Sequence, residues 1–567
     1  MSYAAITFEQ VYYRYIKNQD WVLKNIDLQI AAGSVWLLLG PTGSGKSTVL
    51  SLIRGFHKEW GGELSGSIRL NGQPTGDKTF YEIGDLGIGF VSQDPSLNLH
   101  QLTVRDEIQS TPIYRNFSWE KCNQLADEMM GRLNISDLAD RTPTELSGGQ
   151  MQKVAIAAAL TVAGGEDSGS KGILLLDEPD SFLDFGGRKD LLETIGSLKG
   201  LFTTIVATHR PELYAELADG TSLLVEGQNR ITGTTAEVLY SDAYEETVGN
   251  SWAIRLAKYF KETEYLSSSP LTPNRWVSEL TDKIGTGPSP SRAKQGTISG
   301  DTVSYEDVRF SYPEGGQPLR GVCGHVPPGT LTAIVGNNGS GKTTLAKLTL
   351  NLLKGYEGSI RLLGNDIARY THAELSKIMA YVPQIPREFF LANTVGEECE
   401  LTAKIHGLSD AEQKIRRALE TVGLWDYSDT PVDRLSGGQG RLLTLAATTL
   451  LVNQQITFAD EPEFGVDYNN LDSVLEHFVR IRDNDGTIVM LTHDLDLTLF
   501  CDWVILLHEG KVTKMGHPQQ VYENELDLEN IGLCQPVLFP VFNLVWRDTA
   551  RVSNFRALID ALQAKRR

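Results

Sequence analysis

The chain contains two copies of one set of short motifs, in the same order and at a nearly constant separation. The glycine-rich segment GPTGSGKST ends at Thr48, and its counterpart GNNGSGKTT ends at Thr344. The pentapeptide LSGGQ ends at Gln150 and again at Gln439, and an Asp-Glu-Pro triplet and a Thr-His pair follow in both halves. Landmarks repeated once in a fixed order predict two tandem copies of one domain.

The duplication, with the Gly/Pro/Ser-rich stretch between the copies, predicts four segments along the 567 residues. Apolar residues at helical spacing predict helices within 253–260 and 555–564. We expect a first domain, a helical segment with a linker, a second domain and a helical tail at 1–237, 238–300, 301–525 and 526–567.

Composition and charge exclude several classes of protein. The formal net charge is −20, and the only basic block is the last three residues, which argues against nucleic acid as a direct partner. The 5 cysteines form no CxxC pair, which argues against a zinc site or a disulfide framework. No signal peptide and no apolar run of about 20 residues is present, so we expect a cytosolic chain without a membrane span of its own.

Each glycine-rich segment fits the P-loop pattern G-x-x-x-x-G-K-[ST]. It follows a strand-like run, at 35–39 or 331–335, and precedes a helix-like stretch, which is the context the motif requires. Backbone N–H groups of such a loop surround phosphates, and Lys46 and Lys342 are expected to reach the β- and γ-phosphates of a nucleotide. The expected nucleotide contacts here are Gly40, Pro41, Thr42, Gly43, Ser44, Gly45, Lys46, Ser47, Thr48, Gly336, Asn337, Asn338, Gly339, Ser340, Gly341, Lys342, Thr343 and Thr344.

Two apolar strand-like runs, at 173–176 and 456–459, each end in Asp-Glu. We expect the aspartate, together with the P-loop hydroxyl, on the Mg²⁺ side of the nucleotide, and the glutamate as the general base that polarises the attacking water. The predicted Mg²⁺ residues are Ser47, Asp177, Thr343 and Asp460, and the predicted bases are Glu178 and Glu461.

LSGGQ placed before an Asp-Glu-Pro strand resembles the signature of the ATP-binding cassette (ABC) ATPases. The resemblance implies an α/β fold of two P-loop NTPase domains, each with a helical subdomain, arranged head-to-tail with two ATP molecules and Mg²⁺ between them. It also implies that each signature completes the ATP site of the opposite domain. The signature residues are Ser147, Gly148, Gly149, Gln150, Ser436, Gly437, Gly438 and Gln439.

The same resemblance assigns four further pairs of positions. They are an aromatic residue that stacks on adenine, a Q-loop glutamine that touches Mg²⁺ and the attacking water, a D-loop aspartate and a histidine that contacts the γ-phosphate. In this sequence they are Tyr15 and Tyr312, Gln93 and Gln384, Asp184 and Asp467, and His209 and His493. The D-loop sequence FGVD, which ends at Asp467, departs from the common D-loop sequence of the family. The motif sets of both copies are otherwise complete, so we expect two hydrolytic sites.

Tandem cassettes without membrane spans occur as importer ATPases, as ribosome-acting translation factors and as DNA-repair or structural ATPases. Repair relatives carry zinc modules or long coiled coils, and ribosome-acting relatives carry a charged helical linker. This sequence has none of these features. The amino-acid sequences at 183–192 and 529–536 are similar to the corresponding stretches of energy-coupling-factor ATPases. A fused ATPase of a sugar or peptide importer and a translation factor remain the alternatives.

The energy-coupling-factor resemblance implies integral membrane partners: a scaffold protein and a substrate-binding subunit that takes a vitamin, a precursor or a metal ion. The chain would then lie peripherally on the cytoplasmic face of the membrane. The segments after the Q-loop glutamines, 94–108 and 385–398, would grip the scaffold, with Phe389 and Phe390 as candidate contacts.

Overall fold

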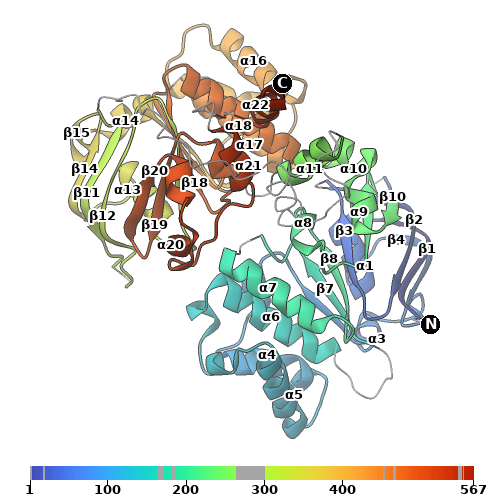
Figure 1. Ribbon diagram of the computed structural model, residues 1–567. Coiled ribbons are helices and arrows are strands. Elements are labelled where there is room, and N and C mark those ends of the chain that lie inside the picture. The colour runs from blue at the N-terminus through green and yellow to red at the C-terminus, as the bar shows by residue number, and fades with distance from the viewer. Residues whose placement is uncertain are drawn as a thin grey trace. The chain divides into compact units, whose positions relative to one another are not determined.

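The protein divides into two compact units, Met1–Arg275 and Trp276–Arg567 (Figure 1). The Gly/Pro/Ser-rich stretch of the segment 238–300, at 285–292, lies outside the residues that the structure describes. The computed structural model describes residues 3–16, 20–41, 43–163, 171–181, 183, 185–262, 300–313, 315–435, 437–450, 454–463, 466, 468–546, 552 and 554–566.

An antiparallel sheet forms one layer of the first unit. Its strands lie in the order β2 (Leu23–Ala31), β1 (Ala4–Arg14), β4 (Glu63–Leu70) and β5 (Gln73–Pro74). Along β2, buried apolar residues alternate with more exposed polar ones. This alternation is typical of a strand with one face on the core and the other in water.

A six-stranded sheet forms the second layer. Its strands are, in order, β10 (Gln228–Gly233), β9 (Gly220–Val225), β3 (Val35–Leu39), β8 (Thr203–Ala207), β7 (Ile173–Asp177) and β6 (Ile88–Val91). Only β10 runs antiparallel to its neighbour among these strands. Strands β3 and β7 are almost wholly apolar because alternate residues enter two cores, Leu37 and Leu174 on one face and Leu38 and Leu175 on the other.

Helices cover the six-stranded sheet on both faces. The longest of them, α6, begins within the LSGGQ pentapeptide. The helices of the first unit are α1 (Lys46–Arg54), α2 (His57–Trp60), α3 (Phe80–Gly84), α4 (Val104–Tyr114), α5 (Trp119–Arg132), α6 (Gly148–Ala163), α7 (Phe185–Leu198), α8 (Pro211–Tyr214), α9 (Thr235–Leu239), α10 (Asp242–Thr247) and α11 (Trp252–Glu262).

The second unit repeats both sheets. The antiparallel one has the order β12 (Leu319–Val326), β11 (Val303–Phe310), β14 (Glu357–Leu362) and β15 (Asn365–Asp366). The six-stranded one has the order β16 (Met379–Val382), β17 (Ile456–Asp460), β18 (Thr487–Thr492), β13 (Leu331–Val335), β19 (Trp503–His508) and β20 (Lys511–Gly516). Read from β6 and from β16, the two sheets have the same strand order, so the repeated motifs mark a repeated fold, as predicted.

The helices of the second unit follow the same plan and add a C-terminal group. They are α13 (Lys342–Thr349), α14 (His372–Ile378), α15 (Val395–Ile405), α16 (Ala411–Thr421), α17 (Gly437–Leu445), α18 (Tyr468–Asp483), α19 (Pro518–Tyr522), α20 (Glu525–Glu529), α21 (Phe539–Val545) and α22 (Phe555–Arg566). The helices predicted within 253–260 and 555–564 are present as α11 and α22.

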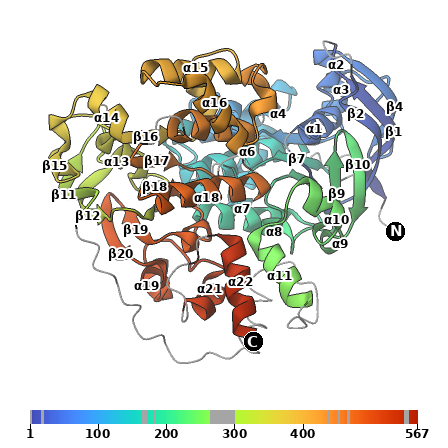
Figure 2. The ribbon, with the colours of Figure 1, turned by 90° about the horizontal axis from the view of Figure 1, so that it is seen from above.

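A helical subdomain extends from each parallel sheet. In the first unit α4 and α5 lie beyond α6, at the end away from β1 and β2 (Figure 1), and α15 and α16 lie together in the second unit (Figure 2). Ile108 of α4 and Met129 of α5 pack in one core with Ile156 of α6. Because α6 also packs on the sheet, the signature at its N-terminus is held by both the subdomain and the core.

The C-terminal helices are packed onto the second unit. Phe542 of α21 contacts Phe500 edge to face, with ring centroids 5.1 Å apart, and the backbone N–H of Leu538 donates to Asp496 at 2.8 Å. Across the described ranges, no helix is long and apolar enough to cross a membrane.

A glycine in each antiparallel sheet sits where no side chain fits. Gly66 in β4 faces a bulge in β1 and has φ +90°, and a Cβ there would lie 2.3 Å from the carbonyl oxygen of Gln10. Gly358 in β14 repeats this at φ +88°, with the carbonyl oxygen of Asp307 at 2.4 Å. The close approach of two backbones therefore requires glycine in both units.

We expect Gly66→Ala to lower the free energy of unfolding by roughly 2–4 kcal/mol, because left-handed strain and a backbone clash add up. Gly72→Ala is the matched control: its φ is +78°, but its Cβ would meet nothing within 4 Å. The control should cost only about 1 kcal/mol. Urea unfolding of the full chain measures both, and equal losses would contradict the clash.

Candidate nucleotide sites

In the first unit a left-handed glycine ends the P-loop and lets α1 begin at the lysine. Gly45 has φ 103°, and the next residue is Lys46. The Lys46 ammonium is buried and donates to the carbonyl oxygens of Gly40 at 2.7 Å and Pro41 at 3.1 Å. The amino group therefore already points into the loop where phosphates are expected.

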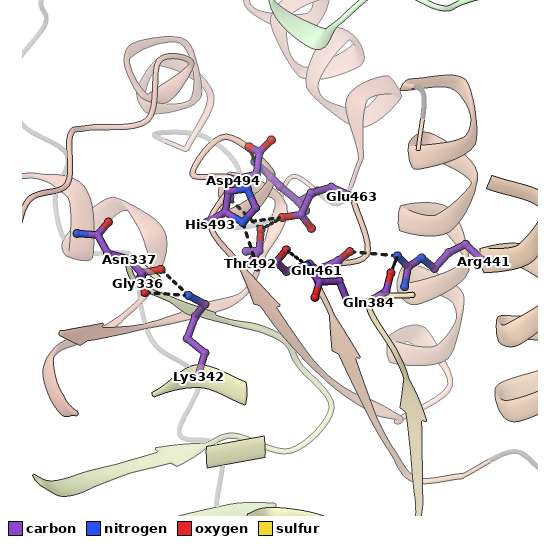
Figure 3. A network of polar contacts seen from close by, with 11 residues as sticks. Gly336, Asn337, Lys342, Gln384, Arg441, Glu461, Glu463, Thr492, His493 and Asp494 are labelled. Carbon is purple, nitrogen blue, oxygen red and sulfur yellow. Dashed lines mark hydrogen bonds and ion pairs between the residues drawn. The ribbon is translucent and has the colours of Figure 1, made fainter. Parts of the chain in front are cut away.

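The second P-loop repeats this arrangement. Gly341 has φ 104°, α13 begins at Lys342, and the ammonium donates to Gly336 O at 2.6 Å and Asn337 O at 3.2 Å (Figure 3). The Asn337 side-chain amide also donates to the carbonyl oxygens of Ile531 and Gly532, each at 3.3 Å. The tail after α20 therefore touches this P-loop, a contact that the motif alone does not predict.

The P-loops have unsatisfied polar groups that fit an anion. The hydroxyls of Ser44 and Ser340 are buried, and within the described residues neither has a hydrogen-bond partner. Burial lowers the pKa of Lys46, against the opposing charges of Glu178 and Asp177. Because a phosphate would supply charge and acceptors to these groups, the residues present fit a nucleotide.

The predicted Mg²⁺ residues lie together in both units. The hydroxyl of Ser47 is hydrogen-bonded to Asp177, and that of Thr343 to Asp460. Burial raises the pKa of both aspartates above its ordinary value. A hydroxyl beside a buried carboxylate at the P-loop is the donor set that Mg²⁺ uses when nucleotide phosphates provide its other ligands.

A glutamine and a histidine converge on the candidate base of the first unit. The side chain of Gln93 donates to Glu178 Oε2 at 3.0 Å, and His209 Nε2 lies 2.8 Å from Glu178 Oε1. Glu178 itself has φ 45°, a left-handed conformation that is uncommon for a residue with a side chain. Such strain clusters at functional positions, where the surrounding contacts hold the backbone.

The second unit builds the same arrangement around Glu461, which has φ 42°. Gln384 donates to Glu461 Oε2 at 2.6 Å, and His493 Nδ1 lies 3.2 Å from Glu461 Oε1 (Figure 3). Burial on its own would raise the pKa of both glutamates, but the histidine's hydrogen bond and charge and the P-loop lysine outweigh it and lower the pKa. Both carboxyls are therefore ionised at neutral pH and able to accept a proton.

The signature pentapeptide forms the N-terminus of a long helix. Ser147 and Gln150 cap α6 reciprocally: Ser147 N donates to Gln150 Oε1 at 3.0 Å, and Gln150 N to Ser147 Oγ at 3.3 Å. Gly148 and Gly149 form the first turn, and in the second unit α17 begins at Gly437, followed by Gly438 and Gln439. Free N–H groups at such helix ends bind anions.

The two predicted adenine residues lie beside their P-loop helices. Tyr15 Oη is 3.2 Å from Thr48 Oγ1, and Tyr312 Oη is 3.0 Å from Thr344 Oγ1. Four other predicted residues, Thr42, Ser436, Asp184 and Asp467, lie outside the described part of the chain.

Sequence reasoning missed several buried polar groups behind each site. Asp180, two residues after Glu178, accepts from the hydroxyl of Tyr214 at 2.7 Å. In the second unit Arg441 is 1% exposed and donates to the backbone carbonyls of Pro383 and of Gln384, the latter at 2.7 Å. An alignment of the two copies would have pointed to both groups, because the copies differ at these positions. Asp180 aligns with Glu463, and Arg441 aligns with a glutamine of the first copy at the second position after LSGGQ.

Comparison with known proteins agrees with this architecture. The sequence family described as ABC transporter matches residues 23–181 and 319–463. A Bacillus subtilis protein that carries the name of an HMP/thiamine import ATP-binding protein, YkoD, is 30% identical over 97% of this chain and 98% of its own length. An ABC transporter ATP-binding protein of Clostridium perfringens is 29% identical over 94% of each chain.

Among solved structures, CbiO1 of Clostridium perfringens, described as part of the ABC transporter complex CbiONQ, is 25% identical, with a TM-score of 0.37. It covers 41% of this chain and 94% of its own. Two family matches on two copies of one fold, together with full-length relatives, establish that this chain is a tandem ATP-binding cassette protein, a member of the ABC transporter ATPases that hydrolyse ATP.

Proposed function

We propose that the chain is the energy-coupling subunit of an importer of the energy-coupling-factor type, bound at the cytoplasmic face of a membrane to a scaffold protein and a substrate-binding subunit. The cargo in this proposal is a vitamin, a vitamin precursor or a metal ion, and a full-length relative named for HMP/thiamine import supports the first two of these classes. The second unit has both its P-loop and the glycines of its signature intact. This supports two working ATP sites.

The observation that carries this proposal is a turn that follows the Q-loop glutamine in both units. In the first unit, buried Glu107 of α4 accepts from the backbone N–H groups of His100 at 2.6 Å and Gln101 at 2.8 Å. The turn held in this way presents Leu102, which is 81% exposed. We take this exposed apolar side chain as a contact for the membrane partner, because the turn that presents it directly follows the Q-loop.

The second unit has the same turn, held by a buried glutamate. Buried Glu398 of α15 accepts from the backbone N–H groups of Leu391 and Ala392, each at 2.9 Å, and Leu391 is 79% exposed. Phe389, expected as a docking residue, is 49% exposed, whereas the ring of Phe390 lies beside Gly440 of α17. Phe389 and Leu391 are therefore the better docking candidates on this segment.

The same segments carry the catalytic glutamines, which links docking to chemistry. Gln93 holds Glu178 at one end of a segment whose other end presents Leu102. A shift of this segment on nucleotide binding would reach both the catalytic carboxylate and the membrane partner. Ser47 with Asp177, and Thr343 with Asp460, would hold Mg²⁺ beside the nucleotide, where the ion would neutralise part of the phosphate charge.

Glu178 and Glu461 act as general bases in this proposal, each oriented by a glutamine and a histidine. Lys46 and Lys342 hold the phosphates, and Tyr15 and Tyr312 the adenines. In the head-to-tail pairing, Ser147 to Gln150 complete the site of Lys342, and Ser436 to Gln439 complete that of Lys46. Release of this pairing after hydrolysis would reset the transporter.

Glu178→Gln combined with Glu461→Gln should retain ATP but lower its turnover at least about 100-fold, because a glutamine cannot accept the proton of the attacking water. Fluorescent-nucleotide binding and phosphate release measure the two properties. Unchanged binding with substantial residual hydrolysis would refute the assignment of the bases.

Lys342→Ala should remove nucleotide from the second P-loop only, because each loop holds its own phosphates. Radiolabelled ATP bound per chain should fall from two molecules to one. Labelling that found no bound nucleotide would disprove two separate sites.

The tagged double Glu→Gln variant, incubated with ATP and detergent-solubilised membranes of the source cells, should capture very hydrophobic membrane subunits identified by mass spectrometry. Leu102→Asp with Leu391→Asp should reduce this capture at least about tenfold, because charges on the docking turns would have to be desolvated. Exposed Leu352→Asp, which lies outside both turns, is the control. Capture of ribosomal proteins with no membrane protein would instead support a translation factor.

A further inference from the structure

The two units differ at one buried carboxyl group, two residues after each candidate base. In the first unit it is Asp180, whose Oδ1 accepts from Tyr214 Oη at 2.7 Å and from Thr208 Oγ1 at 3.3 Å. In the second unit it is Glu463, whose Oε1 accepts from Thr492 Oγ1 and lies 4.0 Å from His493 Nδ1. The shorter carboxyl is held by a tyrosine, and the longer one extends to the histidine.

The histidine rings differ accordingly. His209 presents Nε2 to Glu178 at 2.8 Å, and its Nδ1 is buried with no hydrogen-bond partner in the described part of the chain. His493 presents Nδ1, the nitrogen nearest Glu463, to Glu461 at 3.2 Å. Figure 3 shows the side chains of Glu463, Thr492 and His493 turned toward one another. Thus the two units offer opposite ring nitrogens to their catalytic glutamates.

Charged groups surround Glu463 on every element packed against it. Glu461 at the end of β17 and Asp494 after β18 are negative, whereas Arg441 of α17 is positive and His493 can carry a proton. Burial first, then the charges of Glu461 and Asp494, raise the pKa of Glu463 to about 8. At pH 7 the carboxyl is mostly neutral, so it can accept from Thr492 without competing as an anion for the ring N–H of His493.

We propose that Glu463 is a positioning residue of the second ATP site, which sets the ring orientation of His493 from 4.0 Å away and gives this site a control that the first site lacks. The inference rests on the proposed catalytic roles of His493 and Glu461. Ionised Glu463 competes with Glu461 for the same ring nitrogen, so the contact between His493 and Glu461 is kept at neutral pH and weakened as the pH rises through about 8.

The direct test is ¹⁵N NMR of the histidine rings in the full-length chain, labelled at its 10 histidines. His493→Gln identifies the signals of that ring. Wild-type protein should show a change in the ring shifts of His493 with a midpoint near pH 8. Glu463→Gln keeps the side-chain length and stays neutral, so this midpoint should vanish, whereas Asp180→Asn, the matched variant of the first unit, should retain it.

ATP turnover gives a second readout. At pH 7, Glu463→Gln should keep the kcat of wild type, whereas Glu463→Ala should lower kcat about twofold if the sites are independent and about tenfold if they are coupled, with KM changed less than about twofold. Between pH 7 and 9.5 the wild type and Asp180→Asn should lose turnover relative to Glu463→Gln. Thermal unfolding checks that each variant is folded.

Two results would overturn the inference: a His493 titration near pH 8 that persists in Glu463→Gln, or an equal loss of the titration in Asp180→Asn. If Glu463→Ala does not fold, the Gln variant alone decides. Because the NMR readout needs no turnover, it separates a failure of this inference from a failure of the proposed bases, which Glu178→Gln and Glu461→Gln test independently.

Discussion

Three neighbouring parallel strands end at the same edge of each six-stranded sheet, and both candidate sites depend on this. In the first unit β7 ends at the Asp-Glu pair, β8 leads to His209 and β3 leads into the P-loop. Because β3, β8 and β7 are adjacent and about 4.8 Å apart, Lys46, Glu178 and His209 meet without any contact from the helical subdomain. The order β13, β18, β17 repeats this in the second unit.

The same topology supports two different electrostatic environments. Behind the second site lie Arg441, Glu463 and Tyr381, whose hydroxyl donates to Asp460 at 3.1 Å, whereas the first unit has Gln152, Asp180 and Phe90 at the matching positions. These substitutions leave the strand order unchanged because they occupy the layer of side chains behind the P-loop, lysine and glutamate positions. A duplicated domain can therefore vary each candidate ATP site separately while retaining a common fold.

A buried glutamate holds the turn that follows the Q-loop glutamine in each unit. Glu107 and Glu398 each accept hydrogen bonds from two backbone N–H groups, so each turn is tied stiffly to its own helix. This stiffness suits a segment that transmits a movement. Arg441 strengthens the link in the second unit, since it donates to the Q-loop backbone and to the carbonyl oxygen of Glu461, at 3.3 Å.

The sequence by itself determined the duplication, the P-loop strands and helices and the identity of the candidate bases, because those signals lie in contiguous residues with a fixed spacing. Tertiary structure alone decided which groups face one another across the chain. Tyr214 reaches Asp180 over 34 residues, and Arg441 reaches the Q-loop over 57. Likewise, one extra methylene group in Glu463 matters only once packing places it beside His493. Such long-range contacts depend on how side chains fill a core, and no local pattern encodes that.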